Sequence, residues 1–271
     1  MADADALEPG APGRPAEPPP AVRPPAGPVA PPPPAAIPDD RTMSLVDHLS
    51  ELRTRLFRAI LGVAVGSVIG FIAAKSIRDL LISPLPAGTQ LQVLGPGDAF
   101  MITVRIAIVT GVILAMPVIL YQAWAFIAPG LTPSERRTVR PWLPLALFFF
   151  ALGVVIAWVV LPFALQFLLS FTDTVLLGDR LAAGPYFDFV TTLFLVFGLV
   201  MEFPILLYGL SRVGILTSAR LRAARRYVIL GITIFATVAT PGGDLVSPFV
   251  LGVTMYVLFE ATTFVIRRTG R

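Results

Sequence analysis

The sequence predicts an all-α membrane protein with six transmembrane helices. Of the 271 residues, 55% are hydrophobic and only 14% are charged, and the mean hydropathy is +0.79. A soluble domain carries about 25% charged residues. The formal net charge is +4, but the basic residues lie beside apolar runs, which favours a membrane-surface role over nucleic-acid binding. With no cysteine and one histidine, the chain is expected to hold no disulfide, metal or other cofactor.

Residues 1–42 differ from the rest of the chain. They hold 14 of the 27 prolines and almost no aliphatic run, so they bury too little apolar surface to offset the entropy lost on ordering. We expect a disordered proline-rich tail, followed by one membrane domain at 43–271. No basic cluster followed by an apolar core occurs before position 57, so we expect the N-terminus to be retained and not cleaved as a signal peptide.

The segment 43–58 predicts an amphipathic helix on the cytoplasmic membrane surface. Ser44 is placed as its N-cap. Four leucines recur at the spacing of one helix face: Leu45, Leu49, Leu52 and Leu56. The helix leads directly into the first apolar run.

Apolar runs predict the six spans, at residues 57–74, 106–128, 142–163, 187–210, 227–240 and 245–266. The fifth has 14 residues, about 21 Å of helix, whereas the hydrocarbon core is about 30 Å thick. It ends at a Pro-Gly-Gly turn between Thr240 and Asp244. Helices five and six are therefore expected to form a short hairpin that thins the bilayer or needs a neighbouring helix, unless the boundaries are misplaced by a few residues.

Arginines alternate along the connections between these spans. Three precede the first span, three follow the second, five follow the fourth and three close the chain. The opposite side has fewer basic residues, namely Lys75, Arg78, Arg105 and Arg180. Because basic loops stay in the cytoplasm, both termini are predicted to be cytoplasmic.

Glu202 is the most unusual polar residue, because it lies inside the fourth predicted span. A charge there costs at least about 2 to 3 kcal/mol unless it faces protein or water. Two interpretations remain open: a polar point in a substrate-facing concavity, or a protonated residue bonded to a neighbouring helix. Pro204 removes a backbone hydrogen bond and can bend the span. Arg105 and Glu260 lie near span ends, where structural roles are expected, and His48 is expected to be a surface residue.

Two carboxylates end up on the predicted cytoplasmic face, Glu51 in the first helix and Glu135 after the second span. A carboxylate accepts a guanidinium through two hydrogen bonds, which a lysine ammonium cannot reproduce. Two such acceptors could select paired arginines in a ligand, or each could simply neutralise its own flanking arginines. The sequence contains no phosphate-binding loop, metal-ligand spacing or Ser–His pair, so we do not expect the protein to be an enzyme.

Five ordered motifs resemble the TatC family, the multispanning receptor subunits of the twin-arginine protein translocase. They are His48-Leu-Ser-Glu-Leu-Arg-Thr-Arg-Leu56, Pro117-Val-Ile-Leu-Tyr-Gln-Ala-Trp-Ala-Phe-Ile-Ala-Pro-Gly-Leu131, Glu135-Arg-Arg137, Phe197-Gly-x-x-x-Glu-x-Pro204 and Thr240-Pro-Gly-Gly-Asp244. The resemblance covers about residues 44–268. It implies a bacterial cytoplasmic membrane protein that docks Arg-Arg signal peptides of folded precursors and assembles, in several copies, with single-span TatA- and TatB-type subunits. Export would be driven by the proton-motive force.

The resemblance also implies roles for individual residues. The signal-peptide site would consist of Glu51, Arg53, Phe126, Glu135, Arg136 and Arg137. Glu202 would be the intramembrane polar residue, and Gln122, Thr240 and Ser247 would contact partner subunits. At the turn after the fifth span, the family's usual Gln is replaced by Pro248, so that polar contact is in question.

Two rival functions are weighed against this one. A proton-coupled small-molecule transporter would explain Glu202, but it predicts an internal repeat that the sequence lacks. A passive membrane scaffold would leave the carboxylate in the fourth span unexplained.

Overall fold

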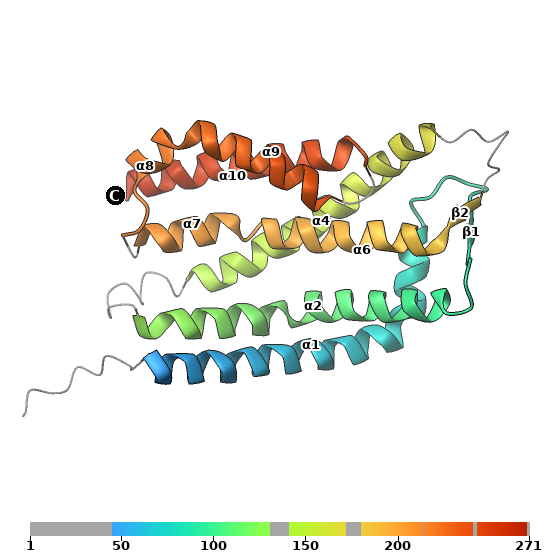
Figure 1. The fold of residues 1–271 in the computed structure, drawn as a ribbon, viewed down its shortest axis with the longest axis horizontal. Coiled ribbons are helices and arrows are strands. Elements are labelled where there is room, and N and C mark those ends of the chain that lie inside the picture. Colours follow the sequence, from blue (N-terminus) through green and yellow to red (C-terminus); the bar gives the residue numbers. More distant parts are fainter. Residues whose placement is uncertain (1–44, 131–140, 172–179, 213, 241–242, 270–271) are drawn as a thin grey trace, which may run out of the picture. The chain divides into compact units, whose positions relative to one another are not determined.

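The structure is a computed structural model that describes residues 45–130, 141–171, 180–212, 214–240 and 243–269 (Figure 1). The chain separates into two units, Met1–Met43 and Ser44–Arg271. The described residues all belong to the second unit, so the predicted proline-rich tail and the predicted N-cap Ser44 lie outside them. The elements are α1 (Leu45–Ile82), β1 (Gln90–Gln92), α2 (Asp98–Ile127), the 3-10 turn η1 (Ala128–Gly130), α4 (Trp142–Ser170), β2 (Arg180–Ala182), α6 (Ala183–Val200), α7 (Phe203–Arg212), α8 (Ser218–Ala223), α9 (Arg225–Ala239) and α10 (Val246–Arg268).

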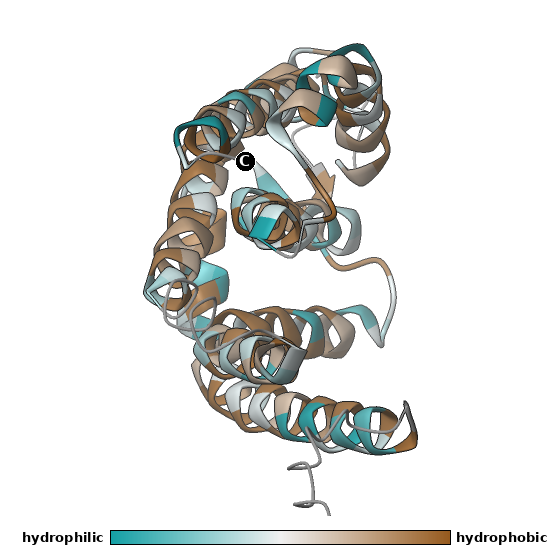
Figure 2. Cartoon of the chain, turned by 90° about the vertical axis from the view of Figure 1, so that its left-hand side faces the viewer, coloured by the Kyte–Doolittle hydropathy of each residue, from teal (hydrophilic) through white to brown (hydrophobic). Residues whose placement is uncertain are grey.

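Five helical segments in the described part of the chain are long and apolar enough to cross a membrane. They are Val46–Ile82, Asp98–Gly130, Trp142–Ser170, Ala183–Arg212 and Val246–Arg268. Hydrophobic residues run along these helices (Figure 2). They contain all the predicted spans except the fifth, which corresponds to α9. With 15 residues, α9 is about 22 Å long, as short as predicted. The expectation that helix six is also short is wrong, because the 23 residues of α10 reach about 34 Å.

The predicted surface helix and the first span form one continuous helix, α1, of 38 residues. The leucine pattern indicates a helix correctly, but the stripe does not cover protein: Leu49, Leu52 and Leu56 are all exposed. The more polar face of the first turns packs on α2 instead. An exposed apolar stripe of this kind is stable in a membrane protein where lipid or the interfacial region covers it.

Glycines allow α1 and α2 to approach closely. A Cβ at Gly66 would lie 2.7 Å from the Gly111 carbonyl oxygen, and one at Gly70 would lie 2.7 Å from the Ala107 carbonyl oxygen. Both distances are shorter than van der Waals contact. Small residues at helix interfaces replace the hydrophobic drive that is missing between helices in lipid.

The central helix of the unit is α6, which packs against α2 and α4 (Figure 1). In the most apolar part of the span that α6 and α7 form, 61% of the residues are buried, whereas the figure for α1 is 11%. Phe187, Leu193 and Phe197 are completely or almost completely buried in the core. Gly153 of α4 brings the two helices together, because a Cβ there would lie 2.9 Å from the Gly198 Cα.

The fourth span breaks between α6 and α7, at Met201 and Glu202. The predicted bend at Pro204 is confirmed as this break. Pro204 lies in the first turn of α7, where a missing N–H is tolerated because no intrahelical acceptor faces it. The Glu202 carbonyl oxygen accepts hydrogen bonds from the amides of Ile205 (3.0 Å) and Leu206 (3.1 Å), which starts the new helix.

Several contacts at the end of α1 and the start of α2 and α6 were not expected from the sequence. The three-residue strands β1 and β2 pair in parallel, which adds a small sheet to the predicted all-α class. Beside them, the Tyr186 hydroxyl donates to the Leu81 carbonyl oxygen at 2.6 Å and ties α6 to α1. Arg105 forms an ion pair with Asp188, which fits the structural role expected for it.

Candidate functional site

The start of α1 and the end of α2 lie side by side (Figure 1). The rings of His48 and Phe126 stack there, with centroids 4.3 Å apart and planes 15° apart. His48 is half-buried: it lies at the surface, as expected, but its ring is partly covered by Phe126. The stack places Phe126, a predicted signal-peptide contact, one helical turn from the part of α1 that carries Glu51.

Glu51 follows His48 by three residues and therefore lies on the same face of α1. Arg55, one turn further on, donates from Nε to Glu51 Oε1 at 2.8 Å, and its Nη2 contacts the same oxygen. The second oxygen, Oε2, is buried and has no hydrogen-bond partner among the described residues. Glu51 thus does pair with a flanking arginine, as the second sequence interpretation expected, but only through one of its two oxygens.

Two more polar atoms are buried near the end of α2 without a hydrogen-bond partner in the described part of the chain. They are Gln122 Oε1 and Trp124 Nε1. Gln122 precedes Phe126 by one turn. A buried polar group without a partner costs about 1–3 kcal/mol.

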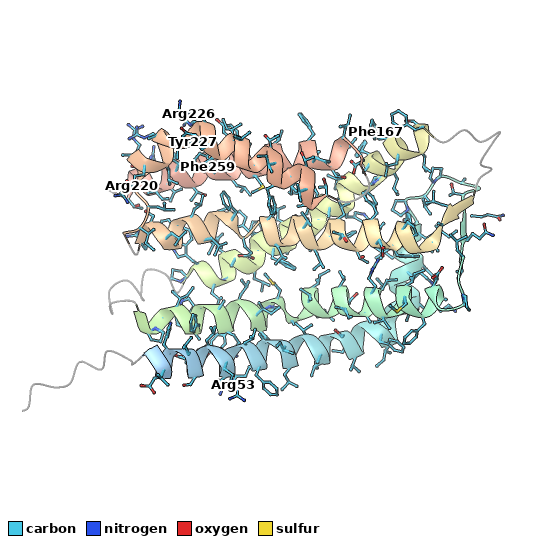
Figure 3. All side chains as sticks on the ribbon, in the orientation of Figure 1. Arg53, Phe167, Arg220, Arg226, Tyr227 and Phe259 are labelled. Carbon is cyan, nitrogen blue, oxygen red and sulfur yellow. The ribbon has the colours of Figure 1, made fainter. Side chains whose placement is uncertain are left out.

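The remaining predicted site residues are not brought together in this way. Arg53 is exposed and points away from α2 (Figure 3). Glu135, Arg136 and Arg137 lie in the stretch between Gly130 and Pro141, outside the described residues.

The helix that follows this stretch is anchored by its first residue. The ring of Trp142 stacks on Tyr208 of α7, with centroids 3.7 Å apart and planes 13° apart. Arg212 donates from Nε to the Tyr208 hydroxyl oxygen at 2.8 Å. A stacked ring therefore lies in the chain on each side of the stretch that carries Glu135: Phe126 before it and Trp142 after it. Both ring pairs join residues far apart in the sequence.

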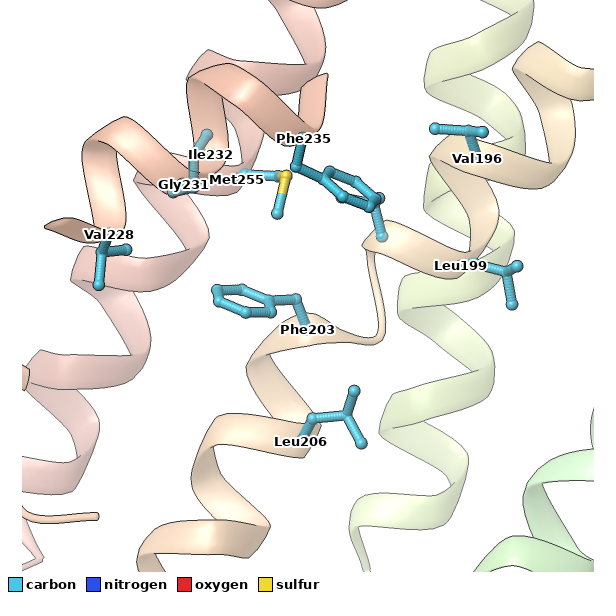
Figure 4. A pocket seen from close by; sticks show the side chains of 10 residues that line it. Val196, Leu199, Phe203, Leu206, Val228, Gly231, Ile232, Phe235 and Met255 are labelled. Carbon is cyan, nitrogen blue, oxygen red and sulfur yellow. The ribbon is translucent and has the colours of Figure 1, made fainter. Parts of the chain in front are cut away.

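Glu202 lies at the break between α6 and α7. It is 8% exposed, and its Oε1 has no hydrogen-bond partner among the residues that the structure describes. An apolar groove of about 520 Å³ is lined by residues on both sides of the break, such as Val200 and Phe203, and runs between the broken span and α9 (Figure 4). Val228 and Phe235 line its α9 side. The structure thus places a buried carboxylate beside an open apolar groove at the middle of a span.

The residues predicted to meet partner subunits divide between two places. Gln122 belongs to the end of α2, whereas Thr240 and Ser247 belong to the turn between α9 and α10, at the other end of these helices (Figure 1). The Thr240 hydroxyl already donates to the Ala236 carbonyl oxygen at 2.7 Å. Ser247 is completely buried, and its backbone amide donates to Asp244 Oδ1 at 2.5 Å. Their contacts with partners stay predictions.

The far end of the hairpin is closed by an ion pair. Arg225 Nη2 lies 2.7 Å from Glu260 Oε2 and joins the start of α9 to α10. This contact fits the structural role expected for Glu260. Within the described ranges, no three His, Cys, Asp or Glu side chains gather closely enough to hold a metal ion.

Sequence reasoning missed three contributors to the candidate site: His48, Trp142 and Tyr208. Each acts through a ring contact with a residue on another helix. The spacing of His48 and Glu51 could have suggested a shared face, but the pairing of α1 with α2 was needed to show what that face meets.

Comparisons with known proteins agree with this architecture. The family model of the Sec-independent protein translocase protein (TatC) matches residues 47–253. A TatC protein of Carboxydothermus hydrogenoformans is 32% identical over 84% of this chain and 94% of its own length, and one of Azotobacter chroococcum is 38% identical over 84% and 91%. A crystal structure of the twin-arginine translocase receptor TatC superposes with a TM-score of 0.73 at 34% identity, covering 83% of this chain and all of that chain.

Proposed function

Because the chain belongs to the TatC family of Sec-independent protein translocase proteins, we propose that it binds the Arg-Arg signal peptides of folded precursors on the face formed by the start of α1 and the end of α2. One observation carries the proposal: the His48–Phe126 stack holds Glu51 beside the end of α2. Glu135 would come from the connection that follows. Two carboxylates at one membrane surface would then receive two guanidiniums.

The proposal includes a six-span topology in the bacterial cytoplasmic membrane, with both termini in the cytoplasm. The distribution of arginines supports it, since Arg53, Arg55 and Arg58 lie in the first part of α1, and the start of α9 and the end of α10 are basic. In this topology α9 is the fifth span. Its 15 residues require a thinned bilayer or a neighbouring helix.

Single-span TatA- and TatB-type subunits would supply such neighbouring helices. A groove of about 850 Å³ between α9 and α10 supports this part of the proposal. It is mainly apolar, but Thr233, Thr237 and Tyr256 contribute hydroxyl groups to its lining. A membrane helix with a polar side chain could pack there and form a hydrogen bond, as helices in bilayers commonly do. Several copies of the chain would assemble in the active complex, with transport driven by the proton-motive force.

The test uses reconstituted membranes and a signal peptide that carries a photo-crosslinker beside its arginine pair. An Arg-Arg peptide should label the segments around Glu51 and Glu135, and an equally charged Lys-Lys peptide should label them much less, because lysine cannot form the two-oxygen pair. Glu51→Gln should reduce the Arg-Arg labelling to the Lys-Lys level. Equal labelling by both peptides would refute arginine recognition at this face.

The rival function, a proton-coupled transporter, is not supported to the same degree. The break at Glu202 resembles the broken helices of transporters, but those occur in matching positions of two repeated halves. A second break of this kind does not occur in the other four described spans. The expected phenotype of Glu202→Gln is therefore impaired assembly or transport with unchanged peptide docking.

A further inference from the structure

Glu51 is already occupied by a guanidinium from its own helix. We propose that Arg55 is a resident ligand of Glu51, which an arginine of the signal peptide must replace, and that it thereby lowers the affinity of the site for signal peptides. The inference rests on the proposed function of Glu51 as a signal-peptide acceptor. It concerns a residue that plays no part in the site as predicted from the sequence.

The geometry of the pair is incomplete. Two nitrogens of Arg55, Nε at 2.8 Å and Nη2, converge on the single oxygen Oε1 of Glu51. The strongest arginine–carboxylate pairs use both oxygens in parallel. Here Oε2 remains buried without a partner among the described residues. A guanidinium that engaged both oxygens would therefore gain a hydrogen bond that the resident one does not make.

The pair is also sheltered from water. The side chains of Arg55 and Glu51 are only 20% and 17% exposed, so salt and solvent screen their attraction less than at an open surface. A glutamate one turn before its basic partner is the favourable order in a helix. The resident pair is consequently stable enough to compete with a ligand.

Other arginines nearby do not share this arrangement. Arg53 points away from α2 (Figure 3). Arg58 lies one turn beyond Arg55 and is exposed. Arg58 therefore carries the same charge on the same helix without the contact to Glu51, which makes it a matched control.

A resident arginine weakens binding by competition. Any ligand that engages Glu51 must first replace Arg55, so the cost of breaking the resident pair is common to all such ligands and cancels from the difference between two of them. A planar guanidinium offsets that cost best, because it reaches both oxygens, whereas a lysine ammonium is a point charge without that fork. Arg55 therefore lowers the affinity, and the preference for arginine comes from the fork itself.

The experiment measures binding of fluorescent Arg-Arg and Lys-Lys signal peptides to the full-length chain in lipid nanodiscs at fixed salt. Arg55→Gln should tighten Arg-Arg binding by about three- to tenfold, because one charge-assisted hydrogen-bonded pair no longer has to be broken. The cost of displacing Arg55 is common to both peptides, so the ratio of the two affinities should change by less than about twofold. Arg55→Lys, which keeps the charge, should tighten Arg-Arg binding less than Arg55→Gln does. Arg58→Gln should change either affinity by less than about twofold, as expected for an exposed charge.

Two outcomes separate the inference from the proposed function. If Glu51→Gln abolishes the Arg-Arg preference but Arg55→Gln weakens binding, leaves it unchanged, or acts no differently from Arg58→Gln, then Arg55 is a structural partner and the inference is wrong. If Glu51→Gln leaves the Arg-Arg preference intact, the proposed function of Glu51 itself is wrong.

Discussion

Replacing Gly66 by alanine should destabilise the packing of α1 on α2. The new Cβ would lie 2.7 Å from the Gly111 carbonyl oxygen and 3.1 Å from the Gly111 Cα. Ordinary contacts of this kind are about 3.5–4.0 Å, so the helices must separate by several tenths of an ångström or more. The obstacle is backbone, which cannot rotate away as a side chain can. Forced overpacking of this kind costs about 1–3 kcal/mol.

The matched control is Gly252→Ala in α10. A Cβ there meets only the side chains of Ala236 and Ile232, both at 3.9 Å, which is ordinary contact. Alanine favours a helix over glycine by up to about 1 kcal/mol, and this gain is common to both variants. The difference between the two variants therefore isolates the close approach of α1 and α2.

The assay is unfolding of the purified chain in mixed detergent and lipid micelles, followed by the loss of helix content. Gly66→Ala should be less stable than Gly252→Ala by about 1–3 kcal/mol. A disulfide crosslink between cysteines engineered into α1 and α2 would report separation of the helices directly. Equal stability of the two variants, with an unchanged crosslinking rate, would contradict the glycine-mediated contact.

Three further predictions test other contacts. His48→Ala should weaken Arg-Arg peptide binding by about two- to tenfold, since a stacked ring pair is worth about 0.5–1.5 kcal/mol, whereas His48→Phe should keep most of the affinity in the same nanodisc assay. Glu260→Gln should lower stability by at most about 1 kcal/mol, because its partner Arg225 is 46% exposed, and the loss should shrink at high salt in unfolding measurements. Asp244→Ala should cost about 1 kcal/mol by removing an acceptor at the start of α10, seen as faster amide hydrogen exchange in its first turn.

Hydrophobic periodicity predicted the helices well, because length and apolar content decide what can cross a bilayer. The third predicted span starts at Trp142, where α4 also starts. The second was expected from residue 106, but α2 begins at Asp98. The eight residues of difference include Asp98, Thr103 and Arg105, whose polarity excludes them from the hydrocarbon core but not from the helix. A hydropathy pattern finds the buried length of a membrane helix, and the structure adds the part that projects beyond it.

Which face of each helix meets protein could not be predicted in the same way. In water, the leucine stripe of α1 would mark the core, and the opposite face would be solvated. In a bilayer, leucines are as stable against lipid as against protein, so a leucine stripe does not indicate which face of the helix contacts protein. The face that packs on α2 is instead the one that carries small residues, such as Gly66 and Gly70, and the half-buried His48 and Glu51. Small size and polarity, more than hydrophobicity, indicate helix contacts in this chain.

Buried polar atoms that lack a partner also follow a pattern along the described residues. They lie at four places: where the start of α1 meets the end of α2, at the break in the fourth span, at the turn between α9 and α10, and near the end of α10. The atoms belong to Glu51, Gln122, Trp124, Glu202, Asp244, Ser247, Glu260 and Thr263. Each costs free energy in an isolated chain. The atoms of Glu51 and Gln122 lie where the proposed function requires contacts with a signal peptide or with other subunits. Near the start of α1, the second oxygen of Glu51 is therefore the decisive atom, because a bound guanidinium that left it without a hydrogen bond would have no advantage there over a lysine ammonium.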